Sequence, residues 1–579
     1  MDTLTLTAGL TTARLATAGL AVFASALVYF VVKGYRARRV FYRLRAQGMP
    51  MPPWSPLLGH LLSIPPITST LPADAQQPDT FSALTHTHSP PSTSPSNSPH
   101  PDPDPAWDGA LYLDMYPFAT PMLVLCSPHL AVQACQTFDL VKPPILHAFF
   151  NPLAGGPNLF TMNGAEWKRS RGLFNPGFNP TYVLQEQTGH VVDEAEVYVS
   201  VLREHARRGG IFSLDEVTCW YAMDIIGAVT LDARLRSQTG FNALASAMRR
   251  QIRWHVLDNE WNLFIRWNPA RPFVQWWNNR QMDGYIGDEL DKRYAEWRAD
   301  GAGAASRSVI HLALASYMAG KEGEKPGEPL PERLDADFRR WATVQIRLFL
   351  FAGHDSTSST ICYCFYLLHK HPAALARLMA EHDEVFGTDL ETTAAKIRAS
   401  PHLLNALPYT TAVIKEALRL FPPASAMRGG DPSVVLTGAS GKSYPTTGTN
   451  IWVLHSAVHR HPSWVQPDAF IPERWLAAPG DPLYPPKGGW RPFEHGPRNC
   501  LGQTLAMLDV KVTLALVVRE MEVRGAYDEW DALRGGRKGV KEVRGERAYQ
   551  TQAGGAHPAD GFPCRVSFRE EGKVGDGEK

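Results

Sequence analysis

A cysteine in a glycine-containing loop near the C-terminal end constrains this chain more than any other feature. Residues 491–502 read RPFEHGPRNCLG and follow the pattern F-x-x-G-x-R-x-C-x-G at Phe493, Gly496, Arg498, Cys500 and Gly502. Glycine permits backbone conformations and close approaches that other residues cannot make. The pattern that follows, residues 501–518, predicts a helix, and the positive end of its dipole would favour a thiolate at Cys500.

An arginine two residues before the cysteine adds a second chemical constraint. The guanidinium of Arg498 is a planar fork that suits a carboxylate. A thiolate beside a carboxylate-binding arginine suits a haem, because iron takes the sulfur and the arginine takes a propionate. A buried cysteine in a glycine-rich turn is the alternative interpretation. Five fixed positions in the ten residues 493–502 favour the haem.

The loop resembles the haem-binding signature of the cytochrome P450 family, and further motifs extend the resemblance. Trp167 and Arg171 match W-x-x-x-R, whose side chains reach a haem propionate in that family. Both lie one helical turn apart and can face one ligand. The resemblance therefore implies haem b (iron protoporphyrin IX), with the Cys500 thiolate as axial iron ligand.

Two other segments match structural motifs of the same family. Glu416 and Arg419 in KEALRLFPP match E-x-x-R, and residues 472–475 (PERW) match a P-E-R-F-like segment with tryptophan in place of phenylalanine. The resemblance implies a buried network of Glu416, Arg419 and Arg474. Without it, an exposed ion pair between Glu416 and Arg419 would be the better interpretation.

The segment AGHDST, residues 352–357, resembles the family's A-G-x-D-T-T in a long central helix. We expect Ala352 and Gly353 to leave room for dioxygen, and Asp355 and Ser356 to supply a proton path in which the carboxylate reaches solvent. Ser356 stands where threonine is usual. The hydroxyl remains, but the methyl that restricts its rotamer is absent.

The N-terminal region predicts a membrane anchor. Residues 15–32 are uncharged, and as a helix they would be about 27 Å long, close to the hydrocarbon thickness of a bilayer. Several basic residues follow this run, which places the C-terminal side in the cytosol. A cleaved signal peptide is the alternative, but it normally carries its charge before the apolar run. We expect a single-pass protein of the endoplasmic reticulum membrane with a cytosolic catalytic domain.

The fold class expected from these features is mainly α with small β-sheets, a cytochrome P450 fold behind a transmembrane helix. We assign residues 1–47 to the anchor and its basic flank, 48–110 to a proline-rich hinge and a disordered insertion (63–105), 111–568 to the haem domain and 569–579 to a polar tail. Long apolar patterns predict helices over 335–372, 374–387 and 410–421. Residues 115–128 predict a hairpin with one strand at 122–126, and a strand begins at 450.

Charge and length bear on the partners. Lys plus Arg total 58 against 57 Asp plus Glu, which argues against a nucleic-acid binder held by bulk charge. Only 79 residues follow Cys500, too few for fused flavin domains. The resemblance implies a separate NADPH–cytochrome P450 reductase as electron donor, docking near Lys168, Arg169 and Arg498. We expect a monomer.

The resemblance implies a monooxygenase that inserts one atom of dioxygen into a lipophilic substrate. Apolar pocket walls are expected at Phe149, Phe150, Phe160, Phe349, Leu350 and Ala426. Between residues 220 and 297, seven tryptophans line either an access channel or the core: Trp220, Trp254, Trp261, Trp267, Trp276, Trp277 and Trp297.

The C-terminal GGAHPADGFPCRVSF, residues 554–568, resembles fungal P450s of polyketide and mycotoxin pathways, including the sterigmatocystin type. The substrate is accordingly expected to be a secondary metabolite. Two alternatives stay open at this point: a P450-fold isomerase or dehydratase that needs no reductase, and a haem-binding protein without turnover.

Overall fold

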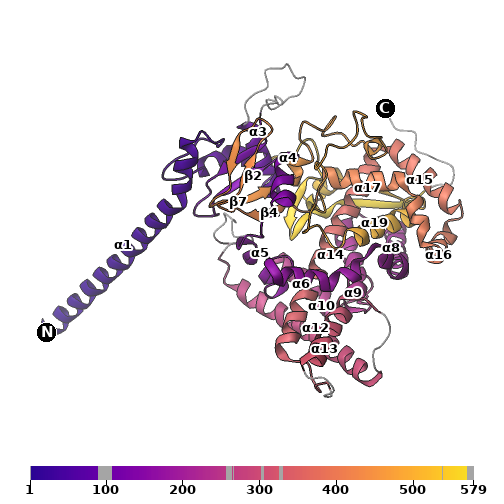
Figure 1. The fold of residues 1–579 in the computed structure, drawn as a ribbon, viewed down its shortest axis with the longest axis horizontal. Coiled ribbons are helices and arrows are strands. Elements are labelled where there is room, and N and C mark those ends of the chain that lie inside the picture. Colours follow the sequence, from indigo (N-terminus) through magenta and orange to yellow (C-terminus); the bar gives the residue numbers. More distant parts are fainter. Residues whose placement is uncertain are drawn as a thin grey trace.

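The computed structural model describes residues 2–88, 107–255, 264, 267–300, 306–324, 330–536 and 539–569. The chain forms one long N-terminal helix, α1, that projects from a mainly helical body (Figure 1). Small sheets lie within that body, and the four-stranded sheet sits on the side that α1 joins. The expected fold class is confirmed.

The α-helices are α1 (Asp2–Ala46), α2 (Ile64–Thr68), α3 (Gln77–Thr87), α4 (Pro128–Val132), α5 (Ile145–Ala154), α6 (Gly164–Phe174), α7 (Pro180–Tyr182), α8 (Thr188–Arg208), α9 (Leu214–Leu231), α10 (Ala243–Arg253), α12 (Ala270–Asp300), α13 (Val309–Glu324), α14 (Ala336–Lys370), α15 (Pro372–Phe386), α16 (Thr393–Ala399), α17 (Pro408–Leu420), α18 (His455–Val458), α19 (Gln503–Val517) and α20 (Tyr527–Leu533). Tighter or wider turns are η1 (Leu61–Ser63), η2 (Gln133–Thr137), η3 (Asn175–Phe178), η4 (Val183–Gln187), η5 (Leu390–Thr392), η6 (Pro401–Ala406), η7 (Pro472–Trp475) and η8 (Ala559–Gly561).

The strands are β1 (Ala110–Leu113), β2 (Met122–Leu125), β3 (Phe212–Ser213), β4 (Ala426–Gly429), β5 (Val435–Thr437), β6 (Ser443–Pro445), β7 (Asn450–Val453), β8 (Met521–Gly525), β9 (Gln550–Ala553), β10 (Gly555–Pro558) and β11 (Pro563–Phe568). They pair as a four-stranded sheet β1-β2-β7-β4, a three-stranded sheet β3-β11-β8, and the hairpins β9–β10 and β5–β6.

The predicted long helices are confirmed as α14, α15, α17 and α19. Helix α14 is buried along most of its length and packs closely on α9. It ends at Lys370, two residues before Pro372, whose ring starts α15. Helix α17 likewise ends before the Pro422–Pro423 pair. The predicted strand at 450 is β7.

The hairpin prediction was wrong in its first strand. Strand β2 pairs antiparallel with β1, which lies before the predicted segment, and residues 114–121 connect the two. Both strands are buried along their whole length. Their side chains alternate between two apolar clusters: Leu123 belongs to one, and Met122 and Val124 belong to the other. A strand buried on both faces lacks the polar alternation by which we sought it.

Two elements cover the two faces of this sheet. Phe41 and Leu44, at the end of α1, are buried in the cluster that contains Leu123. Phe81 and Leu84 of α3 are buried in the cluster on the other face. The prediction of disorder over 63–105 was therefore wrong for α2 and α3, which lie within it, because two apolar side chains of α3 have a sheet to cover. Residues 89–106 lie outside the described residues.

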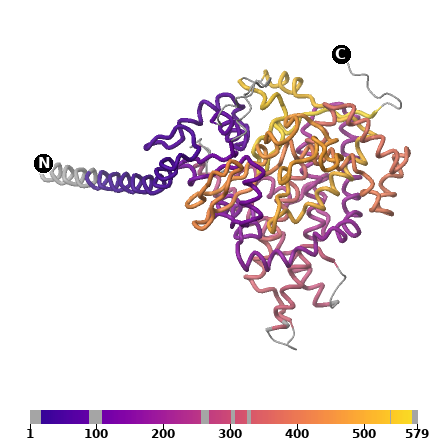
Figure 2. The backbone as a smooth tube through the Cα atoms, turned by 45° about the horizontal axis from the view of Figure 1, so that its top comes forward, coloured from indigo at the N-terminus to yellow at the C-terminus, as the bar shows by residue number. Residues whose placement is uncertain are grey.

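Helix α1 joins the body before the proline-rich segment begins. Arg38 forms a buried ion pair with Asp114 at 3.3 Å, and the Phe30 ring contacts Tyr116. The proline-rich residues 48–60 then run over the sheet, where Tyr112 donates its N–H to the Pro50 carbonyl. The expected hinge is thus packed on the body and does not separate it from α1. Helix α1 projects away from the body (Figure 2), and from Leu20 to Val32 its large apolar side chains are exposed.

The expected buried network is present. The Glu416 carboxylate accepts two hydrogen bonds from Arg419 and one from Arg474, and all three side chains are fully buried. The tryptophan that replaces the usual phenylalanine contributes as well, since Trp475 Nε1 donates to Glu416 Oε2 at 3.0 Å. The network joins α17 to η7, ahead of the Cys500 loop.

We predict that Glu416→Gln lowers the free energy of unfolding by about 3 kcal/mol, because it leaves two buried guanidinium groups without a counter-charge. Urea denaturation of the detergent-solubilised full chain measures this. Glu473→Gln is the matched control, since the Glu473–Arg377 pair is exposed, and it should cost less than about 1 kcal/mol. Equal effects of the two variants would contradict the assignment.

Candidate active site

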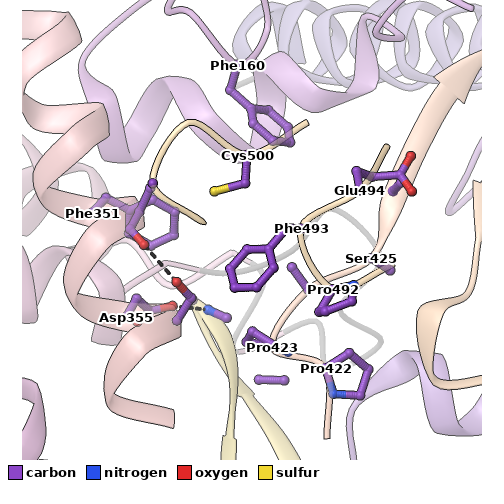
Figure 3. A pocket seen from close by; sticks show the side chains of 18 of the residues that line it. Phe160, Phe351, Asp355, Pro422, Pro423, Ser425, Pro492, Phe493, Glu494 and Cys500 are labelled. Atoms are coloured by element: carbon purple, nitrogen blue, oxygen red, sulfur yellow. Dashed lines mark hydrogen bonds between the residues drawn. The ribbon is translucent and has the colours of Figure 1, made fainter. Parts of the chain in front are cut away.

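A cavity of about 530 Å³ lies between α14, the Cys500 loop and the β9–β10 hairpin. Its volume is in the range of ligand pockets. Most of its wall is apolar and includes many aromatic rings, while a smaller set of charged side chains reaches it from α6, α14 and the Cys500 loop. Figure 3 shows the Cys500 sulfur directed from its loop toward α14, which carries Phe351 and Asp355.

The loop that carries Cys500 is fixed by backbone contacts. The Cys500 N–H donates to the Phe493 carbonyl at 2.8 Å, which closes the loop. Gly496 has φ +83°, and a Cβ there would lie 2.8 Å from the Cys135 carbonyl oxygen, so this position requires glycine. Gly502 has φ −80° and immediately precedes α19. The exposed surface of Cys500 faces the cavity.

The environment of the thiol is balanced between burial and positive partners. Burial raises the pKa of Cys500, while the N–H groups of Gly502 and Gln503 and the charge of Arg171 oppose that rise. The start of α19 alone therefore does not produce the thiolate that the sequence led us to expect. A coordinated metal cation would deprotonate the thiol outright.

Two arginines flank the cysteine, and neither forms an ion pair with a carboxylate of the described residues. Arg171 donates to the backbone oxygen and the side-chain oxygen of Asn499, each at 2.7 Å. Arg498 donates to the Met162 carbonyl at 3.0 Å and to Asn163 Oδ1 at 2.9 Å. Its guanidinium also lies 4.3 Å from the Trp167 ring centroid. Burial and the nearby arginines lower the pKa of Arg498 to about 10.

A buried lysine, which sequence reasoning missed, completes this basic group. Lys142 lines the cavity, is 7% exposed, and places its ammonium 4.1 Å from the Phe160 ring centroid. Burial and Arg428 lower the pKa of Lys142 well below its usual value. Its backbone N–H and C=O both bond to the Asn163 side chain, which also accepts from Arg498. Asn163 thereby holds Lys142 and Arg498 side by side.

This donor set fits a haem. A soft sulfur faces the cavity, its walls are apolar, and Arg171, Arg498 and Lys142 form no ion pair with any carboxylate of the described residues. Buried positive charges without a partner are costly. An anionic ligand with carboxylates at that edge of the cavity would compensate them, and haem carries two propionates.

The predicted residues of α14 lie opposite the cysteine, and all four line the cavity: Ala352, Gly353, Asp355 and Ser356. Ser356 Oγ donates to the Ala352 carbonyl at 3.0 Å. A Cβ at residue 353 would lie 2.4 Å from Ile226, so Gly353 is required mainly for the close packing of α14 on α9. The small residue was expected only to leave room for dioxygen.

Asp355 differs from the expectation of a carboxylate that reaches solvent. It is 3% exposed, accepts the N–H of Gly555, and lies 3.1 Å from His557 Nε2. Burial opposes its ionisation, but His557 holds the pKa of Asp355 below its usual value. The acid is thus tied to the β9–β10 hairpin.

Comparison with known proteins agrees with this geometry. A sequence model described as cytochrome P450 matches residues 112–537, most of the chain. The chain belongs to the cytochrome P450 family. Members hold a haem through a cysteine thiolate and act as monooxygenases.

Relatives of this P450 include fungal enzymes. Cytochrome P450 monooxygenase polC of Polytolypa hystricis (strain UAMH7299) is 39% identical over 94% of both chains. Cytochrome P450 monooxygenase acrF of Aspergillus aculeatus (strain ATCC 16872 / CBS 172.66 / WB 5094) is 33% identical over 79% of this chain and 94% of its own. They support the predicted resemblance to fungal pathway enzymes. The crystal structure of the cytochrome P450DA heme domain shares the fold, with a TM-score of 0.63 at 20% identity over 90% of this chain and 98% of that chain.

The pocket walls of this P450 follow the prediction with one exception. Phe149, Phe150, Phe160, Phe349 and Ala426 line the cavity. Leu350 does not; it is fully buried in the main core, and Phe351 faces the cavity in its place. Adjacent helical residues point about 100° apart, so a run of apolar residues does not show which of them faces a ligand.

The tryptophan cluster lies away from the cavity in the described part of the chain. None of its described members lines the cavity; Trp220 and Trp297 pack against the core, whereas Trp267, Trp276 and Trp277 are exposed. Trp254 is half-buried and Trp261 lies outside the described residues.

Glu494 is a further residue that the motif did not reveal. Its carboxylate accepts from Arg491 Nε at 2.6 Å and Arg428 Nη2 at 3.3 Å, and it points away from Cys500 (Figure 3). Burial opposes the charge, yet His455 and Arg491 hold the pKa of Glu494 well below its usual value. It balances the arginines on the far side of the loop.

We predict opposite effects of Lys142→Met on the apoprotein and on haem retention. Removing an uncompensated buried cation should raise the stability of the apoprotein by about 1 kcal/mol or more, while haem is lost more readily in urea. Thermal unfolding of the apoprotein and haem transfer to apomyoglobin measure the two effects. Lys415→Met is the control, because Lys415 contacts Trp475 and Trp490 away from the cavity. Unchanged haem transfer would remove Lys142 from the site.

Proposed function

We propose that this P450 is a haem-thiolate monooxygenase that oxidises a lipophilic fungal secondary metabolite, a polyketide or a related molecule, with electrons from a separate NADPH–cytochrome P450 reductase. One observation carries the proposal: the Cys500 sulfur and the Ala352–Ser356 face of α14 lie on opposite walls of a single cavity. The alternatives, an isomerase and a haem carrier, have no use for a buried acid beside a hydroxyl in that position.

In this proposal the residues around Cys500 hold the cofactor. Cys500 would hold the haem iron through its sulfur, on a loop shaped by Phe493, Gly496 and Gly502. The two propionates would be held by the basic edge of the cavity, which consists of Trp167, Arg171, Arg498 and Lys142. The bound haem supplies the activation of dioxygen and its insertion into a C–H or C=C bond. The protein supplies the position of the sulfur and the counter-charge.

The opposite wall handles substrate and protons. Aromatic side chains exclude water and bind an apolar molecule, among them Phe149, Phe150, Phe160, Phe349 and Phe351. Ser356 holds its hydroxyl at the cavity surface through the Ala352 carbonyl. Asp355, its neighbour on α14, is the nearest acid in the sequence and supplies the proton that the hydroxyl passes on.

The proposed cellular setting is the endoplasmic reticulum membrane. Helix α1 contains the single stretch, Thr17–Ala46, that is long and apolar enough to cross a bilayer among the described residues. Basic residues follow its apolar part, which supports a cytosolic body. Exposed aromatic side chains at Phe264, Trp267, Phe273, Trp276 and Trp277 suit the membrane interface.

The proposed reductase contact is the exposed face of α6. Lys168 and Arg169 point outward from the helix that also carries Trp167 and Arg171 toward the cavity. Arg498, expected in the same surface, is turned inward to Met162 and Asn163. An acidic partner surface would therefore meet Lys168 and Arg169.

We predict that Cys500→Ala abolishes the carbon-monoxide difference band at about 450 nm that marks thiolate-ligated haem. Reduced protein with and without carbon monoxide is compared by absorbance. Cys126→Ala is the control, since that thiol is buried beside Thr85 and is distant from Cys500 in the sequence. A band that persists in Cys500→Ala would mean that another residue holds the iron.

We predict that Ser356→Ala raises hydrogen peroxide release per NADPH consumed by about twofold or more, because the hydroxyl that passes protons is gone. Ser356→Thr should lower the release, since the added methyl restricts the rotamer. Thr343→Ala is the control: Thr343 makes the same kind of bond to the Arg339 carbonyl, on α14 but outside the cavity. If Ser356→Ala and Thr343→Ala give the same ratio, Ser356 is not on the proton path.

A further inference from the structure

Three buried side chains form a continuous charged array behind the cavity. His557, on β10, lies 2.7 Å from Asp215 through Nδ1 and 3.1 Å from Asp355 through Nε2. Asp215 belongs to α9 and Asp355 to α14, so the array joins three elements that are distant in sequence. Both imidazole nitrogens face a carboxylate oxygen, which is the arrangement of an imidazolium that donates twice.

The hairpin that carries His557 is shaped to bring it to Asp355. Gly554 has φ +95°, and a Cβ at Gly555 would lie 2.6 Å from Asp355 Oδ2. Only glycine at residue 555 allows its N–H to reach that carboxylate (Figure 3, at Asp355). The sequence GGAH, residues 554–557, thus supplies a turn, a backbone donor and a cation to one acid.

The charges around the array leave His557 as the group between two acids. Burial opposes its charge, but Asp215 and Asp355 raise the pKa of His557 well above its usual value. Arg249 of α10 and His354 of α14 are the other basic groups that act on Asp355 or its neighbours, and burial keeps the pKa of His354 at about 4. Cys219 and Glu216 of α9 lie close enough to Arg249 for their charges to act on it. Burial raises the pKa of the Cys219 thiol to about 11.

Exposure gives the array a direction. The Asp215 side chain is 13% exposed, whereas those of His557 and Asp355 are each 4% exposed. Of the three, Asp355 reaches the cavity surface. The outer end therefore meets water more readily than the inner end, which meets the cavity.

We propose that Asp215, His557 and Asp355 form the proton relay of this enzyme, with His557 as the positioning residue that recharges Asp355 from the outer end. His557 gives its Nε2 proton to the Asp355 carboxylate and keeps the proton on Nδ1, which remains bonded to Asp215. Asp355 passes the proton to the cavity through Ser356. A proton from water then binds Asp215, and the neutral ring turns about its Cβ–Cγ bond so that its bare nitrogen takes this proton before the ring turns back. The imidazolium is thereby restored, and one proton enters for each proton delivered. This rests on the proposed function, in which the reductase supplies the electrons.

The hairpin that carries His557 also forms part of the cavity wall. Gln552, Gly554, Gly555 and Ala556 of the β9–β10 hairpin line the cavity on either side of the bond to Asp355.

The test uses full-length protein reconstituted with NADPH–cytochrome P450 reductase in phospholipid vesicles, without added substrate. Dioxygen that receives two electrons and two protons leaves as hydrogen peroxide, and further protons and electrons yield water. His557→Gln replaces the imidazolium with a neutral polar side chain and so removes the positive charge. NADPH oxidation should then slow about tenfold, and the share of dioxygen released as hydrogen peroxide should rise. Asp215→Asn should change the NADPH oxidation rate and the peroxide share in the same directions by a smaller factor. This variant provides the test if His557→Gln does not fold.

Ser359→Ala is the matched control, because Ser359 bonds α14 to the Ala556 carbonyl beside His557 without carrying charge. A second measurement needs no turnover. A raised pKa stabilises the fold fully below the unfolded value of about 6.5, and the contribution is lost as the pH rises toward the folded value. The difference in melting temperature between wild type and His557→Gln should be largest at about pH 6 and shrink as the pH rises toward about pH 9.

Three results would overturn the relay. His557→Gln and Ser359→Ala with the same peroxide share would remove His557 from proton delivery. A melting difference independent of pH would make its role purely structural. The ligand atoms of Asp215, Cys219 and His557 lie within 4.8 Å of one another, as they would around a metal ion. Stoichiometric zinc in the purified wild type, absent from Cys219→Ser, would therefore show that a metal takes the place of the proton. Loss of the carbon-monoxide band in wild type would instead defeat the proposed function, while the melting measurement would still decide the charge of His557.

Discussion

Positive charge that forms no ion pair among the described residues, at the edge of the cavity, is the constraint on which the rest of the site depends. Arg171, Arg498 and Lys142 are held there by amide and carbonyl oxygens, through Asn499 and Asn163, and none of these contacts neutralises a cation. These buried cations therefore lower the stability of the protein until an anionic ligand binds. A dianionic haem completes the electrostatics at the same edge at which Cys500 offers its sulfur.

The far wall has the opposite polarity. Asp215 and Asp355 bring two carboxylates to one imidazole, and the Gly555 N–H adds a dipole to Asp355. One side of the cavity thus attracts anions, and the other stores protons close to a hydroxyl. The basic edge and the acidic wall come from different parts of the fold. The acidic wall depends on the close packing of α14 on α9, which requires a glycine at residue 353.

Sequence motifs predicted those site residues whose chemistry is encoded locally. The Cys500 loop and the Trp167–Arg171 turn are each set by spacing within one short segment, and both segments line one cavity. The Glu416–Arg419 pair is equally local, and Arg474 joins it from η7. The partner of Asp355 could not be found in this way, because His557 lies some 200 residues later and meets it only through the β9–β10 hairpin. Lys142 carries no motif, and α3 reads as polar until the sheet that it covers is known.

The position of α1 gives the apolar cavity a direction within the molecule. Gln77 of α3 and Phe118 of the β1–β2 connection line the cavity, and Tyr116 of the same connection contacts Phe30 and Arg38 of α1. Helix α3 lies on the side of the body from which α1 emerges (Figure 1), so the cavity extends toward that side. Because the large apolar side chains of α1 from Leu20 onward stand free of the body, a membrane that holds them lies near that side. For the lipophilic substrate proposed above, such a membrane would therefore lie on the side to which the cavity extends.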